Sequence, residues 1–259
     1  MAIHEKLNDL KIGSLTGRNG FLDNRPNLVM IHGAGGNARV WQNQISLLDR
    51  TLNVLALDLP GHGKTPAKGY DSIAEHTRWL GDVIEALFEE PIFLMGHSMG
   101  GAIVQEAAFT YPDLLKGIIL VSTGPRLRVA PMLIEGILDN FEQTVDTVMR
   151  YAYSLKTDKT IIAEGAKLMK SAGADIVHVD FLACDEFDSR QDLNHIHLPC
   201  LVICGNQDKM TPLKLSETLH QNIEESILKT IPNAGHMVMI ERYRELNEAA
   251  LEFIMGLEA

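Results

Sequence analysis

The sequence predicts an α/β protein built on a mostly parallel, doubly wound sheet, with a helical segment inserted in the second half of the chain. Apolar, strand-like runs alternate with amphipathic helical stretches over most of the 259 residues. The strand runs are nearly continuous in apolar residues, which is typical of parallel strands covered by helices on both faces. The alternation stops between about 124 and 190, where helical spacing alone is found, and then resumes.

The elements follow from these runs in chain order. Residues 1–27 are mixed, but Gly13, Gly17 and Gly20 with Asn19 predict a hairpin turn between two short strands. Beyond them we expect strands from 27 to the glycines at 33–36, over 52–57, from 92 to Ser98, and over 117–121, 200–204 and 226–231. We expect helices over about 38–48, 71–88, 102–111, 212–222 and 238–257.

The insertion carries apolar residues at helical spacing, namely Leu133, Ile137, Phe141, Val145, Val148 and Tyr151. Further helices are expected over 161–170 and 174–187, broken by Gly173. We therefore divide the chain into a core domain of residues 1–124 and 191–259 and a helical insertion of residues 125–190. Counting both hairpin strands, the insertion follows the sixth strand.

Composition excludes several classes of protein. A net charge of -11 argues against a nucleic-acid surface. No apolar run reaches 18 residues and no basic-then-apolar leader precedes the core, so we expect neither a membrane span nor a signal peptide.

Three cysteines without framework spacing suit the reducing cytoplasm. Cys200 and Cys204 lie roughly 13 Å apart in a strand, too far for a disulfide. They are interpreted as buried thiols in preference to a metal pair.

The strongest candidate for chemistry is Ser98, in the sequence Gly96-His97-Ser98-Met99-Gly100 at a strand-to-helix junction. This pattern in this context is a nucleophile elbow, whose turn is so tight that side chains at positions 96 and 100 would clash. The turn presents the serine hydroxyl at a helix N-terminus, which favours developing negative charge. The competing interpretation is a glycine-rich turn whose serine only caps the helix.

A serine nucleophile needs a base and a group that orients the base. Asp208 and His236 each follow a late strand, so both lie at the carboxyl edge of the sheet with Ser98. The alternatives are that Asp208 caps the helix near Pro212 and that His236 is a surface-loop histidine. The loop after Val121 contains no carboxylate, which favours Asp208 as the acid.

An oxyanion hole requires two backbone donors. We expect them to be the N–H groups of Met99 and of Ala34, the latter in the glycine-rich loop 32–36. A dinucleotide fingerprint is excluded for this loop, because Ala38 stands where the third glycine would be needed.

These motifs together resemble the α/β-hydrolase fold family, and in particular its small cap-bearing esterases, lipases and C–C hydrolases. The resemblance covers nearly the whole chain outside the insertion. It rests on His32-Gly33-Ala34-Gly35-Gly36, Asp58-Leu59-Pro60-Gly61-His62-Gly63, the elbow, Gly205-Asn206-Gln207-Asp208 and Pro232-Asn233-Ala234-Gly235-His236. It implies Ser98 as nucleophile, His236 as base, Asp208 as orienting acid, and Ala34 and Met99 as oxyanion donors, with no cofactor and no metal.

The predicted activity is hydrolysis of a carboxylic ester through an acyl-enzyme, on a small-molecule substrate with a small or apolar acyl group. A C–C bond hydrolase of the meta-cleavage type, a thioesterase, an acyltransferase and a perhydrolase remain alternatives on the same triad, as does a non-catalytic binding protein. Ser98 disfavours the dehalogenase and epoxide hydrolase branches, which use aspartate there. A homodimer is left open. His97 and His62 are interpreted as structural.

The insertion resembles the family's cap and is expected to select the substrate. Six of its apolar residues are candidates for an apolar pocket: Leu133, Ile137, Phe141, Leu155, Met169 and Phe181. Arg126, Arg128 and Arg190 flank it and could bind a substrate carboxylate. The alternative is that they pair with neighbours such as Asp188.

Overall fold

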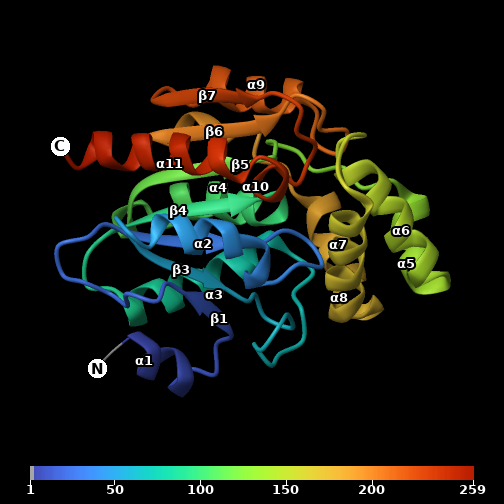
Figure 1. Ribbon diagram of the computed structural model, residues 1–259, viewed down its shortest axis with the longest axis horizontal. Helices are drawn as coiled ribbons and strands as arrows, with labels where there is room; N and C mark the ends of the chain where they lie inside the picture. The colour runs from blue at the N-terminus through green and yellow to red at the C-terminus, as the bar shows by residue number, and fades with distance from the viewer. Residues whose placement is uncertain (1–2) are drawn as a thin grey trace.

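The computed structural model describes residues 3–259 and contains one seven-stranded sheet in the order β1-β3-β2-β4-β5-β6-β7 (Figure 1). The strands are β1 (Ser14–Thr16), β2 (Asn27–Ile31), β3 (Asn53–Leu57), β4 (Ile92–His97), β5 (Leu115–Val121), β6 (Cys200–Gly205) and β7 (Ser226–Ile231). All neighbouring pairs are parallel except β1 with β3. The predicted fold class, a mostly parallel α/β sheet, is confirmed.

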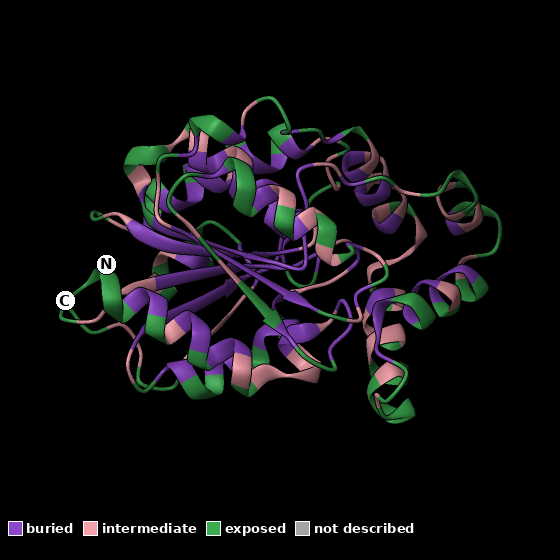
Figure 2. Cartoon of the chain, turned by 90° about the horizontal axis from the view of Figure 1, so that it is seen from above, coloured by how far each residue is buried: buried purple, intermediate pink, exposed green. Residues whose placement is uncertain are grey.

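Helices cover both faces of the sheet. One face carries α1 (Ile3–Asp9), α3 (Ile73–Leu87), α4 (Met99–Thr110) and α9 (Leu213–Asn222), and the other carries α2 (Gln42–Leu48), α10 (Val238–Glu241) and α11 (Tyr243–Leu257). Within β2, Val29 and Ile31 pack into the first layer while Leu28 and Met30 pack into the second. This alternation is the two-residue period of a strand. Figure 2 shows mostly buried strands between two layers of helices, while the edge strands β1 and β7 are largely not buried.

The predicted N-terminal hairpin is wrong, because β1 is the one strand that forms there among residues 3–26. The chain after it is held by side chains of the core. Oδ2 of Asp49 accepts hydrogen bonds from the backbone N–H groups of Arg18 (2.9 Å) and Asn19 (3.2 Å), and Oδ1 of Asn53 accepts one from Leu22 N–H (2.9 Å). These contacts satisfy backbone donors that a second strand would have used. The insertion therefore follows the fifth strand, not the sixth.

Two helices expected as single segments are divided. The stretch 133–151 forms α5 (Pro131–Asp139) and α6 (Phe141–Ala152), separated at Asn140, and 238–257 divides into α10 and α11 at Arg242. Asn140 and Arg242 have ψ values of 65° and 48°, outside the helical range. Helical spacing on both sides of one non-helical residue looks continuous in sequence, so periodicity alone does not reveal the break.

The insertion is completed by α7 (Lys159–Ala172) and α8 (Ala174–Glu186), and its four helices lie beyond the carboxyl ends of the strands (Figure 1). It has an apolar cluster of its own, in which Ile137, Val145 and Val177 are fully buried. An antiparallel bridge between Arg126 and Asp188 joins the two chain segments at its base. Short 3-10 turns occur at Ala38–Trp41, Pro112–Leu114 and Leu193–His195. None of the helices in residues 3–259 combines the length and apolar character that crossing a bilayer requires.

Candidate active site

Ser98 lies in the turn between β4 and α4 with a φ of 53° and a ψ of -116°. A non-glycine residue with positive φ is strained, so the surrounding structure must hold it there. Its N–H donates to Val121 O (3.0 Å), and its carbonyl accepts from Thr123 Oγ1 (2.9 Å). Within the described chain its side chain makes no capping bond to α4, contrary to the interpretation as a helix cap.

The two glycines of the elbow have steric roles. A Cβ on Gly96 would collide with the backbone of Gly100, and a Cβ on Gly100 would collide with the carbonyl of Ile31 in β2. The first clash is the one expected from the sequence. The second shows that position 100 is also limited by the neighbouring strand.

Asp208 and His236 are buried and bonded to each other. Asp208 Oδ2 lies 2.9 Å from His236 Nδ1, and the two side chains are 0% and 4% exposed. Asp208 follows β6 and His236 follows β7, so the two parallel strands bring together residues 28 positions apart. This bond occupies Nδ1 and leaves Nε2 as the ring nitrogen available to a substrate or nucleophile.

Asp208 is fixed by its own loop. Its Oδ1 accepts from the N–H groups of Met210 and Thr211 (both 2.9 Å), and its Oδ2 accepts from Thr211 Oγ1 (2.8 Å). These donors precede α9, so Asp208 stabilises a turn and does not cap the helix at Pro212. Burial raises the pKa of this carboxyl, but His236 and the Thr211 donors outweigh burial and lower the pKa overall. The carboxylate is therefore ionised at neutral pH.

His97 packs against His236. Its ring centroid lies 4.7 Å from that of His236, and its Nε2 lies 3.1 Å from the His236 carbonyl oxygen. Burial, with a smaller contribution from His236, lowers the pKa of His97 to about 3. His97 is therefore a neutral packing residue.

The inserted helices hold the His236 loop, a feature that sequence reasoning missed. Ala152 O, at the end of α6, accepts from the N–H groups of His236 (2.8 Å) and Met237 (3.2 Å). Glu241 accepts from Gly235 N–H (2.9 Å) with Oε1 and from Ser154 N–H (2.9 Å) with Oε2. One carboxylate thus links the insertion to the residue that precedes His236.

Two carboxylates bind backbone N–H groups in and just after the loop that carries Ala34. Asp58 Oδ1 accepts from Ala38 N–H (2.7 Å), and Asp180 Oδ2, in α8, accepts from Gly35 N–H (2.7 Å). Ala34 lines two pockets together with Ser98 and His236. Met99 is the first residue of α4, so its N–H has no partner within the helix.

The contacts of His62 are with buried side chains outside the two pockets that contain Ser98. Its Nε2 lies 2.9 Å from Asp180 Oδ2, and its ring centroid lies 4.8 Å from that of His32. Burial disfavours the charged ring, but the Asp180 carboxylate outweighs burial and raises the pKa of His62. The sequence gives no sign of this pairing, because Asp180 lies 118 positions away in a helix.

Two pockets contain both Ser98 and His236. The small pocket, about 70 Å³, lies between the Ala34 loop and the insertion and is lined by apolar residues such as Val148, Met169 and Met237. The large pocket, about 820 Å³, extends from Ser98 between the loop after β5, helices α5 and α8, and the start of α9. A substrate placed at Ser98 therefore has a short apolar space on one side and a long space on the other.

The predicted pocket residues divide into three groups. Leu133 and Phe181 line the large pocket, and Met169 and Phe181 line the small one. Ile137 and Phe141 pack in the core of the insertion. Leu155 is 87% exposed and lines neither pocket, so its assignment was wrong. It follows α6 in an exposed turn, where helical spacing carries no information on burial.

All three flanking arginines line the large pocket and also have acidic partners. Arg190 makes two short bonds to Asp188 (2.8 and 2.6 Å), Arg126 Nε lies 3.9 Å from the same carboxylate, and Arg128 lies 3.3 Å from Asp185. The expected pairing with Asp188 is confirmed for Arg126 and Arg190.

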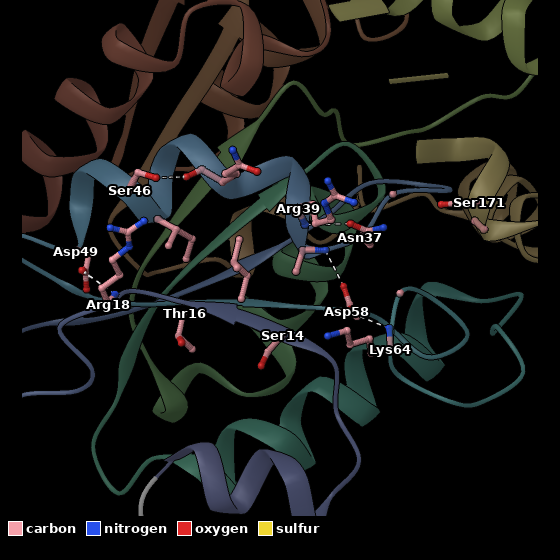
Figure 3. A pocket seen from close by; sticks show the side chains of 17 residues that line it. Ser14, Thr16, Arg18, Asn37, Arg39, Ser46, Asp49, Asp58, Lys64 and Ser171 are labelled. Carbon is pink, nitrogen blue, oxygen red and sulfur yellow. Dashed lines mark hydrogen bonds between the residues drawn. The ribbon is translucent and has the colours of Figure 1, made fainter. Parts of the chain in front are cut away.

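A third cleft, of about 900 Å³, lies beside α2 and β1 and contains neither Ser98 nor His236. Figure 3 shows its polar lining, with Arg18, Arg39 and Lys64 alongside Asp49 and Asp58. We refer to it as the α2 cleft.

Residues 28–249 match the model of the Alpha/beta hydrolase family. Two curated relatives are similar over most of their length. A pimeloyl-[acyl-carrier protein] methyl ester esterase from Neisseria meningitidis is 25% identical over 243 residues, which are 88% of this chain and 93% of that protein. An (E)-2-((N-methylformamido)methylene)succinate hydrolase from Acinetobacter baylyi is 27% identical over 236 residues, which are 86% of this chain and 88% of that protein.

Solved structures agree with this match. A thermophilic esterase superimposes with a TM-score of 0.83 at 32% identity, covering 95% of this chain and 94% of its own. The enol-lactonase from Burkholderia xenovorans has a TM-score of 0.87 at 21% identity, covering 94% of this chain and 96% of its own, and at that identity it supports the fold alone.

Proposed function

Because this chain belongs to the alpha/beta hydrolase family and is an enzyme of the hydrolase class, we propose that it is a serine hydrolase that cleaves a carboxylic ester at Ser98. The observation that carries the proposal is the buried Asp208–His236 bond beside a serine held at positive φ, with Ser98 and His236 lining the same two pockets. These are the parts that nucleophilic acyl transfer needs.

In the proposed reaction, His236 Nε2 takes the Ser98 proton as Oγ attacks the ester carbonyl carbon. The N–H groups of Ala34 and Met99 stabilise the negative charge that develops on the carbonyl oxygen. His236 then returns the proton to the leaving alcohol as the carbon–oxygen bond breaks, which leaves an acyl-Ser98 ester. Water, deprotonated by His236, attacks this ester and releases the acid, and His236 reprotonates Ser98.

Asp208 serves this cycle as an orienting acid. Its bond to Nδ1 holds the ring in the tautomer whose Nε2 accepts a proton. Its lowered pKa keeps it ionised, so it stabilises the imidazolium that forms twice in each turnover.

We also propose that residues 125–190 form a cap that determines the substrate, since α6 and α8 contribute Val148 and Phe181 to both pockets. A cytoplasmic location is part of the proposal and is supported by Cys184, Cys200 and Cys204, which are free and buried. A homodimer stays a prediction of the sequence.

The test is turnover of a 4-nitrophenyl ester series, from acetate to long acyl chains, by the wild type and by Ser98→Ala. We expect turnover in the wild type and a loss of at least about 10³-fold in kcat in the variant, with its unfolding transition retained. Wild-type turnover that persists in Ser98→Ala would overturn the assignment. Covalent labelling of Ser98 by a phosphonate without ester turnover would retain the nucleophile and overturn the ester as its substrate.

A further inference from the structure

The lining of the large pocket has a charge opposite to that of the whole molecule. The chain has 34 acidic and 23 basic residues. The charged residues that line the large pocket are all cationic, namely Arg126, Arg128, Arg190, Lys209 and Lys214. An anion approaching the protein as a whole is repelled, so a cationic lining around one pocket is a local attraction at that site.

Two aspartates just outside the pocket offset part of this charge. Asp188 forms ion pairs with both Arg126 and Arg190, and Asp185 forms one with Arg128. The hydrogen bonds from Arg190 outweigh a small effect of burial and lower the pKa of Asp188 to about 2, so this carboxylate is ionised. Among residues 3–259, Lys209 and Lys214 have no ion-pair partner. Three positive charges therefore remain uncompensated around the pocket.

Four of the five positive charges lie at the rim of the pocket, and the fifth, Arg126, is more enclosed, with its side chain 20% exposed. Arg128 and Arg190 have side chains 72% and 63% exposed, and Lys209 and Lys214 are exposed as well. Toward Ser98 the wall is apolar and includes Phe181, which is 4% exposed, and Val148, which is 2% exposed. A molecule that fills the pocket thus meets apolar wall next to its ester and cations at its far end.

We propose that the preferred ester carries a carboxylate on the part that occupies the large pocket, joined to the reacting carbonyl or oxygen by an apolar spacer. This inference rests on the proposed function and specifies its substrate class. The small pocket, with room for only a few water-sized groups at about 70 Å³, takes the shorter, uncharged part. Lys209 and Lys214 are the residues that select the charge, since the arginines already have partners.

The α2 cleft also has three cationic side chains, Arg18, Arg39 and Lys64, but Asp49 and Asp58 line it with them. It contains no residue of the proposed triad. Lys64 is exposed, and no ion pair within the described residues involves its side chain. It lines the α2 cleft and not the large pocket, so Lys64→Glu changes the net charge as Lys214→Glu does, but outside the large pocket.

The experiment compares two pairs of esters matched in length. 4-Nitrophenyl hexanoate and mono-4-nitrophenyl adipate differ by a terminal carboxylate on the acyl part. Phenyl hexanoate and 4-carboxyphenyl hexanoate differ by a carboxylate on the alcohol part. The readout is the ratio of kcat/KM for the anionic ester to that for its neutral partner, in the wild type, Lys209→Glu, Lys214→Glu, the double variant and Lys64→Glu.

We expect a ratio above one in at least one pair, which identifies the part that lies in the large pocket. The ratio should fall as ionic strength rises from about 0.02 M to about 0.5 M, because salt screens exposed charges. Lys209→Glu and Lys214→Glu should each lower the ratio of kcat/KM values about fivefold or more, and the double variant should lower it further. Lys64→Glu should keep this ratio within about twofold of the wild-type value.

A ratio at or below one in both pairs overturns the proposal, as does a ratio that responds equally to Lys64→Glu and Lys214→Glu. In that case, Ser98-dependent turnover of the neutral esters would still uphold the esterase function. Absence of Ser98-dependent turnover with all four esters would instead overturn the proposed function itself.

Discussion

Asp180 and Gly35 are joined by a buried hydrogen bond of 2.7 Å, from the backbone N–H of Gly35 to the Asp180 carboxylate. Asp180 belongs to α8 of the insertion, and Gly35 follows Ala34, the proposed oxyanion donor. The same carboxylate oxygen lies 2.9 Å from His62 Nε2, and both side chains are fully buried. The insertion is therefore bonded directly to the loop of the proposed oxyanion donor.

Asp180→Ala should lower kcat by about tenfold, because Gly35 would lose the contact that fixes the Ala34 N–H. It should also lower the free energy of unfolding by about 3 kcal/mol, because His62 would lose its buried partner. Steady-state kinetics and urea unfolding measure the two effects. Asp175→Ala, an exposed change in the first turn of the same helix, is the control. A wild-type kcat in Asp180→Ala would contradict the role in positioning.

Glu241→Ala should reduce kcat by about tenfold with a smaller effect on KM, because Gly235 N–H and Ser154 N–H lose their shared acceptor beside His236. Glu241→Gln keeps one acceptor oxygen, so its kcat should lie between that of Glu241→Ala and that of the wild type. Glu248→Ala, an exposed change in α11, provides the comparison. Equal loss in Glu241→Ala and Glu248→Ala would speak against a specific role for the bridge.

Gly96→Ala should prevent the native elbow from forming, because the added Cβ collides with the backbone of Gly100, which cannot move without shifting α4. We expect loss of the cooperative unfolding transition or a destabilisation above about 3 kcal/mol. Gly256→Ala is the matched control, since a Cβ there meets open space in α11 and should stabilise by up to about 1 kcal/mol. A stable, active Gly96→Ala protein would refute the steric account.

The protein should lose stability as pH falls below about 6.5. Burial is the main cause that lowers the pKa of His76 to about 4 and of His97 to about 3. Below pH 6.5 these histidines bind protons in the unfolded chain but not in the folded protein. Their contribution to the free energy of unfolding is therefore full above pH 6.5 and is lost as the pH falls toward their folded pKa values. At pH 5 each loses about 2 kcal/mol, from about 1.5 pH units at 1.36 kcal/mol each. His62, with its raised pKa, opposes this trend.

Urea unfolding at pH 7.5 and pH 5 measures the difference in the free energy of unfolding, to which His76 and His97 together should contribute about 4 kcal/mol. His32, whose pKa is lowered chiefly by burial, adds to this loss at pH 5, and His62 offsets part of it. His76→Leu should reduce the difference by about 2 kcal/mol, while His4→Leu, at an exposed position in α1, should leave it unchanged. The same difference in His76→Leu and wild type would exclude His76 as a source of acid sensitivity.

The sequence by itself was sufficient for strands β2 to β7, for most of the helices that cover them and for the proposed chemistry. Apolar runs and helical spacing are local signals, and they identified β2 through β7 within a few residues. Ser98, Asp208 and His236 each follow such a strand, and the carboxyl ends of parallel strands meet at one edge. A local pattern therefore indicated a non-local site, and the structure brings Asp208 and His236 to bonding distance.

Only the tertiary structure decided which side chains support that site and what surrounds it. Asp180 bonds to a residue 145 positions away, and Glu241 bonds to one 87 positions away. Lys209 and Lys214 line the same pocket as three arginines of the insertion, which the sequence does not reveal. The failed N-terminal hairpin has the same cause, since Asp49 and Asn53 hold that segment from a distance. A polar side chain forms equally good bonds with many partners, and the path of the folded chain determines which one lies within reach.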